Sequence, residues 1–264
     1  MNINLKNRTA IVTGGAQGIG YVIAEKLLNE GVRVSIWDND DEHLEKVSKT
    51  FSKDFKKNFL AVLCDVSNEA DVKKAMNSTL HYFGSVDILV ANAGIVSTKK
   101  VADLNENEWE RVFEVNAKGA FLCAKEVAEE FKKNKFGRII IASSFAAIIP
   151  SIGSSAYAAS KSAVNSLVRV LAGELGPWGI TVNSYAPGMI PSNMSKIDSL
   201  TEQRKEMMLD SLSIREWGKA EDIASLVIFL ASDQARYITG SFIDASGGKF
   251  SVQFGKLAYE DNED

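Results

Sequence analysis

Short apolar runs alternate with longer amphipathic stretches along nearly the whole sequence, and this alternation constrains the fold most strongly. The short runs are typical of buried strands, and the stretches with a helical period are typical of helices. Seven runs have the character of strands, at residues 10–12, 32–37, 59–64, 86–90, 139–142, 180–185 and 241–245. Strands that alternate with helices predict parallel pairing. The pattern therefore predicts an α/β fold, in which helices cover both faces of one doubly wound, seven-stranded parallel sheet.

Chain length, net charge and residue counts narrow the class of protein. The 264 residues suffice for one large domain, and no repeat or linker divides them, so we expect a single domain over 1–264. A formal net charge of -4 argues against nucleic acid and anionic membranes as partners. The sequence has no long apolar window and no signal-peptide pattern, which predicts a cytoplasmic protein. The two histidines and two cysteines form no metal-ligand pattern, so we expect no metal site, and Cys64 and Cys123 as buried free thiols.

A glycine-rich turn follows the first apolar run and leads into an amphipathic stretch. Gly14, Gly18 and Gly20 would let the backbone approach a pyrophosphate, and the helix that follows would offer free N–H groups. Asp38 ends the second run about 20 residues further on, where an acidic side chain can accept hydrogen bonds from ribose hydroxyls. A carboxylate there repels a 2′-phosphate, and the turn carries Gln17 rather than an arginine. The pattern favours NAD over NADP.

A tyrosine and a lysine form the second informative pattern. Tyr157 and Lys161 lie four residues apart in a helix-compatible segment, so their side chains share one face of a helix. An ammonium beside a phenol favours the phenolate, which predicts a Tyr157 pKa lowered toward neutrality. Ser144 ends the preceding strand, where open α/β sheets place ligand-contacting groups. This arrangement predicts acid/base chemistry that accompanies hydride transfer.

Two further segments bear on the site. Asn116 interrupts a long helical run, and asparagine is a poor helix former unless it has a hydrogen-bond partner.

Residues 189–215 lose the strand–helix regularity and include Met194 and Met207, so we interpret them as a candidate substrate lid; a surface insertion or a subunit contact is the alternative. Residues 255–264 form an acidic tail.

Together, these elements resemble the short-chain dehydrogenase/reductase family in its single-domain Rossmann form. The resemblance runs from about Leu5 to Gly248. The matching elements are Thr13-Gly14-x-x-x-Gly18-x-Gly20, Asp65-Val66, Asn92-Ala93-Gly94, Asn116, Ser144, Tyr157-x-x-x-Lys161 and Pro187-Gly188. The chain departs from the usual pattern at Ala91, where an asparagine is common, at Ser192 in place of a threonine, and at Ser246 in place of an aspartate.

The resemblance implies four catalytic residues. Tyr157 would be the general acid/base, and Ser144 would hold the substrate oxygen while charge develops on it. Lys161 would bind the nicotinamide ribose and, with the positive nicotinamide ring, lower the Tyr157 pKa. Asn116 would keep a water that links Lys161 to solvent as a proton relay.

The resemblance also implies the dinucleotide-binding residues. They are Gly14, Gln17, Gly18, Ile19, Gly20, Asp38, Asp65, Val66, Asn92, Ala93, Gly94, Tyr157, Lys161, Pro187, Gly188, Ile190 and Ser192. The glycines would line the pyrophosphate, Asp38 would bind the adenosine ribose, and Asp65 with Val66 would contact the adenine.

The function expected from these residues is NAD-dependent hydride transfer between a secondary alcohol, such as a sugar, polyol or small hydroxy compound, and its ketone. A 3-oxoacyl thioester reductase and a hydroxysteroid-like dehydrogenase are alternatives, and an NAD-bound non-catalytic scaffold is an alternative of another class. Reductases that act on acyl carrier proteins usually use NADP and face an acidic carrier. Asp38 and the net negative charge therefore argue against a 3-oxoacyl thioester as the substrate. The family resemblance implies a homotetramer, or a homodimer.

Overall fold

A single parallel sheet forms the centre of the computed structural model, which describes residues 3–192, 195, 197–252 and 256–260. The strands are β1 (Thr9–Thr13), β2 (Arg33–Asp38), β3 (Phe59–Leu63), β4 (Ile88–Ala91), β5 (Gly137–Ala142), β6 (Ile180–Pro187) and β7 (Phe242–Ala245). Their order is β3-β2-β1-β4-β5-β6-β7, and the strand pairs are parallel. The predicted seven-stranded parallel sheet is confirmed. The fourth strand begins at Ile88 rather than Val86, and the sixth extends to Pro187.

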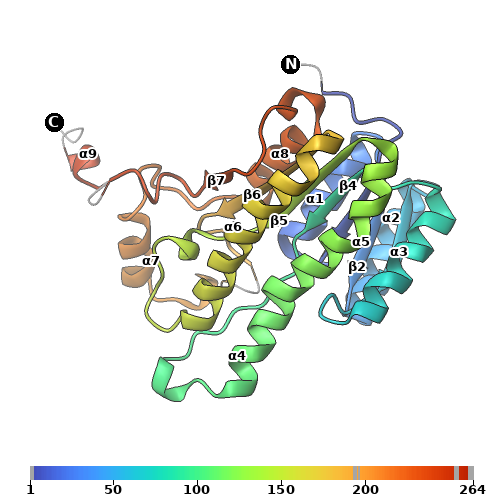
Figure 1. Cartoon of the computed structure of the whole chain (residues 1–264). Helices are drawn as coiled ribbons and strands as arrows, with labels where there is room; N and C mark the ends of the chain where they lie inside the picture. Colours follow the sequence, from blue (N-terminus) through green and yellow to red (C-terminus); the bar gives the residue numbers. More distant parts are fainter. Residues whose placement is uncertain (1–2, 193–194, 196, 253–255, 261–264) are drawn as a thin grey trace.

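Helices cover both faces of this sheet, as predicted (Figure 1). The helices are α1 (Gly18–Asn29), α2 (Asp41–Asp54), α3 (Glu69–Phe83), α4 (Glu106–Phe113), α5 (Gly119–Asn134), α6 (Ser155–Leu175), α7 (Glu202–Leu209), α8 (Ala220–Ala231) and α9 (Leu257–Glu260). A π-helix, η2 (Glu114–Lys118), joins α4 to α5, and 3-10 turns are η1 (Val101–Asp103), η3 (Phe145–Ala147), η4 (Gly176–Trp178), η5 (Ile197–Ser199) and η6 (Asp233–Ala235). No described helix is both long and apolar enough to cross a membrane.

The strands are apolar on both faces because each face packs against helices. In β5, Ile140 belongs to the core cluster that includes α1, α2 and α8, whereas Ile139 and Ile141 belong to the cluster that includes α3, α5 and α6. This alternation is the two-residue period of a strand. Cys64 and Cys123 are buried and free in the second cluster, as predicted.

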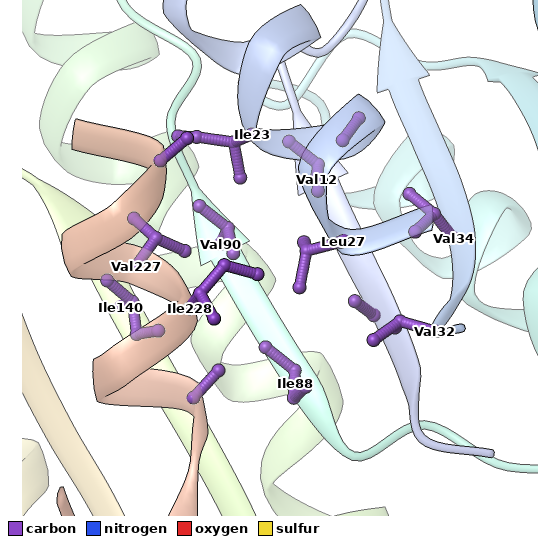
Figure 2. Close-up of a cluster of buried hydrophobic side chains, with 14 of the residues drawn as sticks. Val12, Ile23, Leu27, Val32, Val34, Ile88, Val90, Ile140, Val227 and Ile228 are labelled. Atoms are coloured by element: carbon purple, nitrogen blue, oxygen red, sulfur yellow. The ribbon is translucent and has the colours of Figure 1, made fainter. Parts of the chain in front are cut away.

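Figure 2 shows how α1 and α8 pack together over the sheet. Ile23 and Leu27 of α1 meet Val227 and Ile228 of α8 above the strands, and each of the four is at most 5% exposed. Full burial of such a side chain contributes about 1.5–3 kcal/mol. The core therefore fixes the helices firmly on the faces of the sheet. The loops at the carboxyl ends of the strands remain open to a ligand.

Two stretches differ in detail from the sequence-based expectation. The long helical run that Asn116 was expected to interrupt is continuous through α4, the π-helix and α5, and Asn116 lies in the π-helix. The segment 189–215 is not without regular structure, because it contains η5 and α7. Met194 and residues 193 and 196 lie outside the described residues, as do 253–255 and 261–264 of the tail.

Candidate functional site

A cavity of about 890 Å³ opens at the carboxyl ends of the strands. It lies where the strand order reverses between β1 and β4, which is the usual ligand position in such sheets. The predicted residues that line it are Gly14, Gln17, Gly18, Ile19, Asp38, Asp65, Val66, Asn92, Ala93, Gly94, Tyr157, Lys161, Pro187, Ile190 and Ser192. The fold thus brings residues from positions 14 to 192 around one space.

Four predicted site residues are not among those lining the cavity: Gly20, Asn116, Ser144 and Gly188. A Cβ at Gly20 would lie 2.1 Å from the Gly14 carbonyl oxygen, and one at Gly188 would lie 2.6 Å from the Ser246 Cα. These two glycines therefore permit close packing of the chain, and their contact with a dinucleotide stays a prediction.

The glycine turn presents the start of α1 to the cavity. Gly14 and Gly18 have positive φ angles of 61° and 57°, a region that favours glycine. Gln17 precedes α1 without a side-chain cap, and the first turn of the helix has no acidic residue. The first N–H groups of a helix have no intrahelical partner, and they lie at its positive dipole end. The turn and this helix end therefore fit a pyrophosphate.

Asp38 is held firmly at the end of β2. Its Oδ2 accepts a hydrogen bond from the Ala16 N–H at 3.0 Å, its Oδ1 accepts one from the Asp40 N–H at 3.2 Å, and the residue is 8% exposed. Among the described residues that line the cavity, only Arg111 and Lys161 carry a positive charge. The carboxylate therefore fits a ribose diol better than a 2′-phosphate.

Asp65 and Arg111, which also line the cavity, form an ion pair. Asp65 accepts hydrogen bonds from the Ser67 N–H at 2.9 Å and hydroxyl at 2.7 Å, and from Arg111 Nη2 at 3.0 Å. Burial alone would raise the Asp65 pKa, but the bonds from Ser67 and Arg111 outweigh burial and lower it. Arg111 reaches Asp65 from α4, 46 residues away in sequence. Both can contact a base bound beside them.

Tyr157 and Lys161 lie one turn apart on α6, as their spacing predicts. Lys161 is 3% exposed; its Nζ donates a hydrogen bond to the Ala142 carbonyl at 2.8 Å and lies 5.7 Å from the centre of the Tyr157 ring. Burial lowers the pKa of Lys161 to about 8. Burial also raises the pKa of Tyr157, and a hydrogen bond with Ser144 opposes this only in part.

The predicted lowering of the Tyr157 pKa by Lys161 is therefore wrong for the protein alone. Removal of water disfavours the phenolate, and the ammonium points to the Ala142 carbonyl rather than to the phenol oxygen. In this state Tyr157 is a protonated acid at neutral pH.

Ser144 and Asn116 are the other two predicted catalytic residues. Ser144 is 5% exposed, and its Oγ accepts a hydrogen bond from the Ala146 N–H at 3.1 Å. Asn116 Oδ1 accepts from the Ile95 N–H at 2.8 Å, and its Nδ2 donates to the Ile95 carbonyl and to Ser160 Oγ, both at 3.0 Å. The side-chain amide thus has the partners that an asparagine in a helix needs. Both of its hydrogens are used within the protein, and the water relay through Asn116 stays a prediction.

Several residues that line the cavity were not predicted from the sequence: Tyr21, Trp37, Ile95, Arg111 and Tyr185. Trp37 and Tyr185 lie in apolar strand runs and are indistinguishable from core residues by pattern alone. Arg111 lies in a charged helix. One signal could have indicated that Tyr185 lines the site: it lies two residues before Pro187, near the carboxyl end of its strand.

Comparisons with known proteins agree with this geometry. A family model described as enoyl-(acyl carrier protein) reductase matches residues 14–249. The chain is 36% identical over 245 residues to the 3-oxoacyl-(acyl-carrier-protein) reductase FabG of Staphylococcus epidermidis, which covers 92% of this chain and 99% of the relative. It is 34% identical over 250 residues to the FabG of Rickettsia felis, covering 95% and 100%.

Solved structures give the same result. The crystal structure of levodione reductase has a TM-score of 0.87 and 29% identity, covering 92% of this chain and 98% of the other. The crystal structure of gox2181 has a TM-score of 0.88 and 32% identity, covering 93% and 96%. Both FabG relatives are named 3-oxoacyl-(acyl-carrier-protein) reductases, which corresponds to the thioester-reductase alternative and not to a sugar or polyol dehydrogenase.

Proposed function

The chain belongs to the short-chain dehydrogenase/reductase family, and from this membership we propose that it is a reductase of 3-oxoacyl thioesters. Relatives with this name match at 34–36% identity over nearly their whole length. From the sequence, a sugar, polyol or small hydroxy compound was the expected substrate. The comparisons favour the alternative, and the site contains two features that support it.

The first feature is the state of the proposed acid. Reduction of a ketone needs a protonated group beside the carbonyl oxygen, and the raised pKa of Tyr157 keeps its phenol protonated at neutral pH. Ser144, which bonds with Tyr157, would share the oxygen as charge develops on it. The buried ammonium of Lys161 would stabilise the phenolate left after proton transfer.

The second feature, on which the choice of substrate rests, is the group of exposed apolar side chains that follows the proposed catalytic serine in the chain. Ile148, Ile149 and Ile152 follow Ser144 in the chain and are 56%, 46% and 95% exposed. Ile95 and Val96 line the cavity itself. Such side chains suit an acyl chain, because they offer apolar contact rather than hydrogen bonds to hydroxyls.

For the cofactor we propose NAD(H), which supplies or accepts the hydride when bound. The glycine turn and the start of α1 would hold the pyrophosphate, and Asp38 would bind the ribose diol. Lys161 would bind the nicotinamide ribose. The segment 189–215, with α7 at its centre, would close over the substrate.

Asp38 also favours a second candidate function, the NAD-linked oxidation of a small alcohol such as a sugar or polyol. A carboxylate that excludes NADP suits an enzyme that works with the oxidised cofactor NAD. The two candidates share the cavity and the proposed proton chemistry and differ in substrate class.

One assay separates these candidates. NADH or NADPH is mixed with the purified protein and acetoacetyl-coenzyme A, a small 3-oxoacyl thioester, and the loss of reduced-nicotinamide absorbance is followed. A parallel panel contains NAD with sugars, polyols and hydroxy acids. We expect rapid oxidation of NADH by the thioester and slower turnover of the panel. Preferential turnover of a panel member would instead establish the second function. Tight NAD binding without turnover in either arm would contradict both and favour a non-catalytic scaffold.

We also propose that the chain assembles as a homotetramer. Exposed apolar side chains on α4, α5 and α6 support a covered surface there: Trp109, Phe121 and Val170 are 39%, 44% and 56% exposed. Light scattering coupled to size exclusion tests this assembly.

A further inference from the structure

Tyr185 is a buried tyrosine that the proposed chemistry does not use. It lies in β6, is 0% exposed, and ranks with Trp37 among the largest fully buried side chains of the described residues. It nevertheless lines the cavity from below. A phenylalanine would fill nearly the same volume, so packing alone does not explain the hydroxyl.

The hydroxyl has one well-placed acceptor. It donates a hydrogen bond to Asn92 Oδ1 at 2.9 Å. Burial raises the pKa of Tyr185 well beyond its usual range, so the group stays protonated and remains a donor. A buried hydroxyl is costly to retain without a partner, which makes this bond the reason for a tyrosine at this position.

Asn92 transmits the contact to the glycine turn. Its Nδ2 donates to the carbonyls of Thr13 and Gly14 at 3.1 and 3.2 Å. The Thr13 hydroxyl in turn accepts the N–H groups of Asn92 and Ala93 at 3.1 and 3.0 Å. The amide is therefore fixed by the turn on its nitrogen side and by Tyr185 on its oxygen side.

The sheet register explains how Tyr185 reaches Asn92. Strand β5 lies between β6 and β4, and Ala142 of β5 is the register partner of Tyr185. Partners in neighbouring strands point to the same face, so the small Ala142 side chain leaves room for the phenol to cross β5. The Ala142 carbonyl also accepts the hydrogen bond from Lys161 Nζ. The ring thus lies beside the strand end that holds Lys161.

The geometry points to Tyr185 as a positioning residue for the dinucleotide: its hydroxyl holds the Asn92 amide, and through it the main chain of the glycine turn. The inference rests on the dinucleotide site of the proposed function and is independent of the substrate. Without the hydroxyl, the Asn92 oxygen loses its donor, and the amide is free to turn away from the Thr13 and Gly14 carbonyls. The turn then loses part of the shape that receives the pyrophosphate.

The test is the dissociation constant of NADH, measured by fluorescence titration, for Tyr185→Phe, Asn92→Ala and the double variant. We expect Tyr185→Phe to raise this constant about fivefold to twentyfold, because a buried acceptor is left without its donor. In the Asn92→Ala background, the same substitution should change it less than about twofold, since the intermediary is gone. Tyr237→Phe is the matched control: it removes a hydroxyl from a residue that is 94% exposed and should leave binding unchanged.

Two results would overturn the inference. One is a Tyr185→Phe variant that binds NADH within about twofold of the wild type. The other is an effect of equal size with and without Asn92, which would mean that Tyr185 acts only on the stability of the fold; the thermal midpoint of each variant is measured alongside. If the wild type itself binds neither NADH nor NADPH, the proposed function fails instead, so the two failures are distinguishable.

Discussion

The wall of the cavity and the segment around α7 are held by different kinds of contact. Buried hydrogen bonds hold the dinucleotide side. Thr13 and Asp38 bond the main-chain N–H groups of Ala93 and Ala16, Tyr185 bonds the Asn92 side chain, and all three residues are at most 8% exposed. Ion pairs near the surface hold the segment around α7: Arg215 Nε lies 3.0 Å from Asp210, and Arg215 also pairs with Glu206.

This difference predicts which side can move. A buried acceptor or donor that loses its partner costs about 1–3 kcal/mol, whereas an exposed ion pair contributes little because solvent screens it. The dinucleotide side is therefore rigid before any ligand arrives. The segment around α7, which we propose as the substrate lid, is held by contacts that cost little to break. Changes on the rigid side should have large effects on binding or chemistry, and changes on the lid side small ones.

Tyr157→Phe should have the largest effect. Loss of a positioned acid or base reduces turnover by about 10²- to 10⁴-fold. The dissociation constant of NADH should change less than about twofold, because the ring remains and only the hydroxyl is lost. Turnover with acetoacetyl-coenzyme A and NADH titration check the two parts. A variant that retains turnover would remove Tyr157 from the chemistry.

Gly20→Ala tests whether the dinucleotide side is rigid. The new Cβ would lie 2.1 Å from the Gly14 oxygen, so the turn must shift; overpacking of this kind is costly, and we expect NADH affinity to fall about tenfold to hundredfold. Gly173→Ala is the matched control, since no neighbouring atom lies within 4 Å of its Cβ. It should bind NADH normally and raise stability by about 0.5–1 kcal/mol, because alanine favours the helix. Unchanged binding by Gly20→Ala would show that the turn yields easily.

Asp38→Asn separates charge from shape on the same side. The amide oxygen can still accept from the Ala16 N–H, but the repulsion of a 2′-phosphate is lost. We expect the preference for NADH over NADPH, measured as a ratio of dissociation constants, to fall about tenfold. Glu42→Gln is the control, because it removes one exposed negative charge on α2. A wild-type protein that prefers NADPH would contradict the cofactor assignment.

The buried residues Tyr157 and Lys161 should determine how turnover depends on pH. Burial raises the Tyr157 pKa, so the phenolate needed for alcohol oxidation is scarce at neutral pH. Oxidative turnover should rise by about tenfold per pH unit on the acid side of that pKa. Reductive turnover, which needs the protonated phenol, should stay flat up to about pH 8 and fall as Lys161 loses its charge. Lys161, with a pKa of about 8, keeps its full charge only below that pH. Stopped-flow rates from pH 6 to 10 check both limbs, and a flat oxidative limb would show that the bound dinucleotide already lowers the Tyr157 pKa toward neutrality.

The same contrast explains what the sequence could predict. The seven strands and the β1 turn were predictable because their apolar periods and glycines are local signals. Tyr157 and Lys161 were predictable in position, because a spacing of four fixes their common helix face. The sign of the Tyr157 pKa shift was not, since it depends on burial by the assembled site and on the Ala142 carbonyl, which engages Lys161.

Contacts between distant segments account for the other gaps. The bond from Tyr185 to Asn92 joins residues 93 positions apart, and the pair of Arg111 with Asp65 joins residues 46 apart. Neither residue type nor local period marks these partners. The α7 segment was predicted as a departure from regularity, but its helix was not, because no apolar face marks Glu202–Leu209: none of its residues is buried.

The smallest effect is expected on the lid side, from Tyr259→Phe. The tail beyond residue 249 lies outside the family match, and the Tyr259 hydroxyl ties it to the segment after α7: it donates to the Ser213 carbonyl at 2.8 Å and accepts from the Arg215 N–H at 3.2 Å. Lys256 adds an ion pair to Asp210 at 3.4 Å. Exposed bonds of this kind contribute little to stability, so the KM for acetoacetyl-coenzyme A should rise only about twofold to fivefold, with kcat and NADH affinity unchanged. Tyr237→Phe again serves as the control. A fall in kcat or NADH affinity as large as that of a rigid-side variant would mean that the cavity wall and the segment around α7 form one coupled unit, and the distinction between a fixed dinucleotide side and a loosely held lid would not stand.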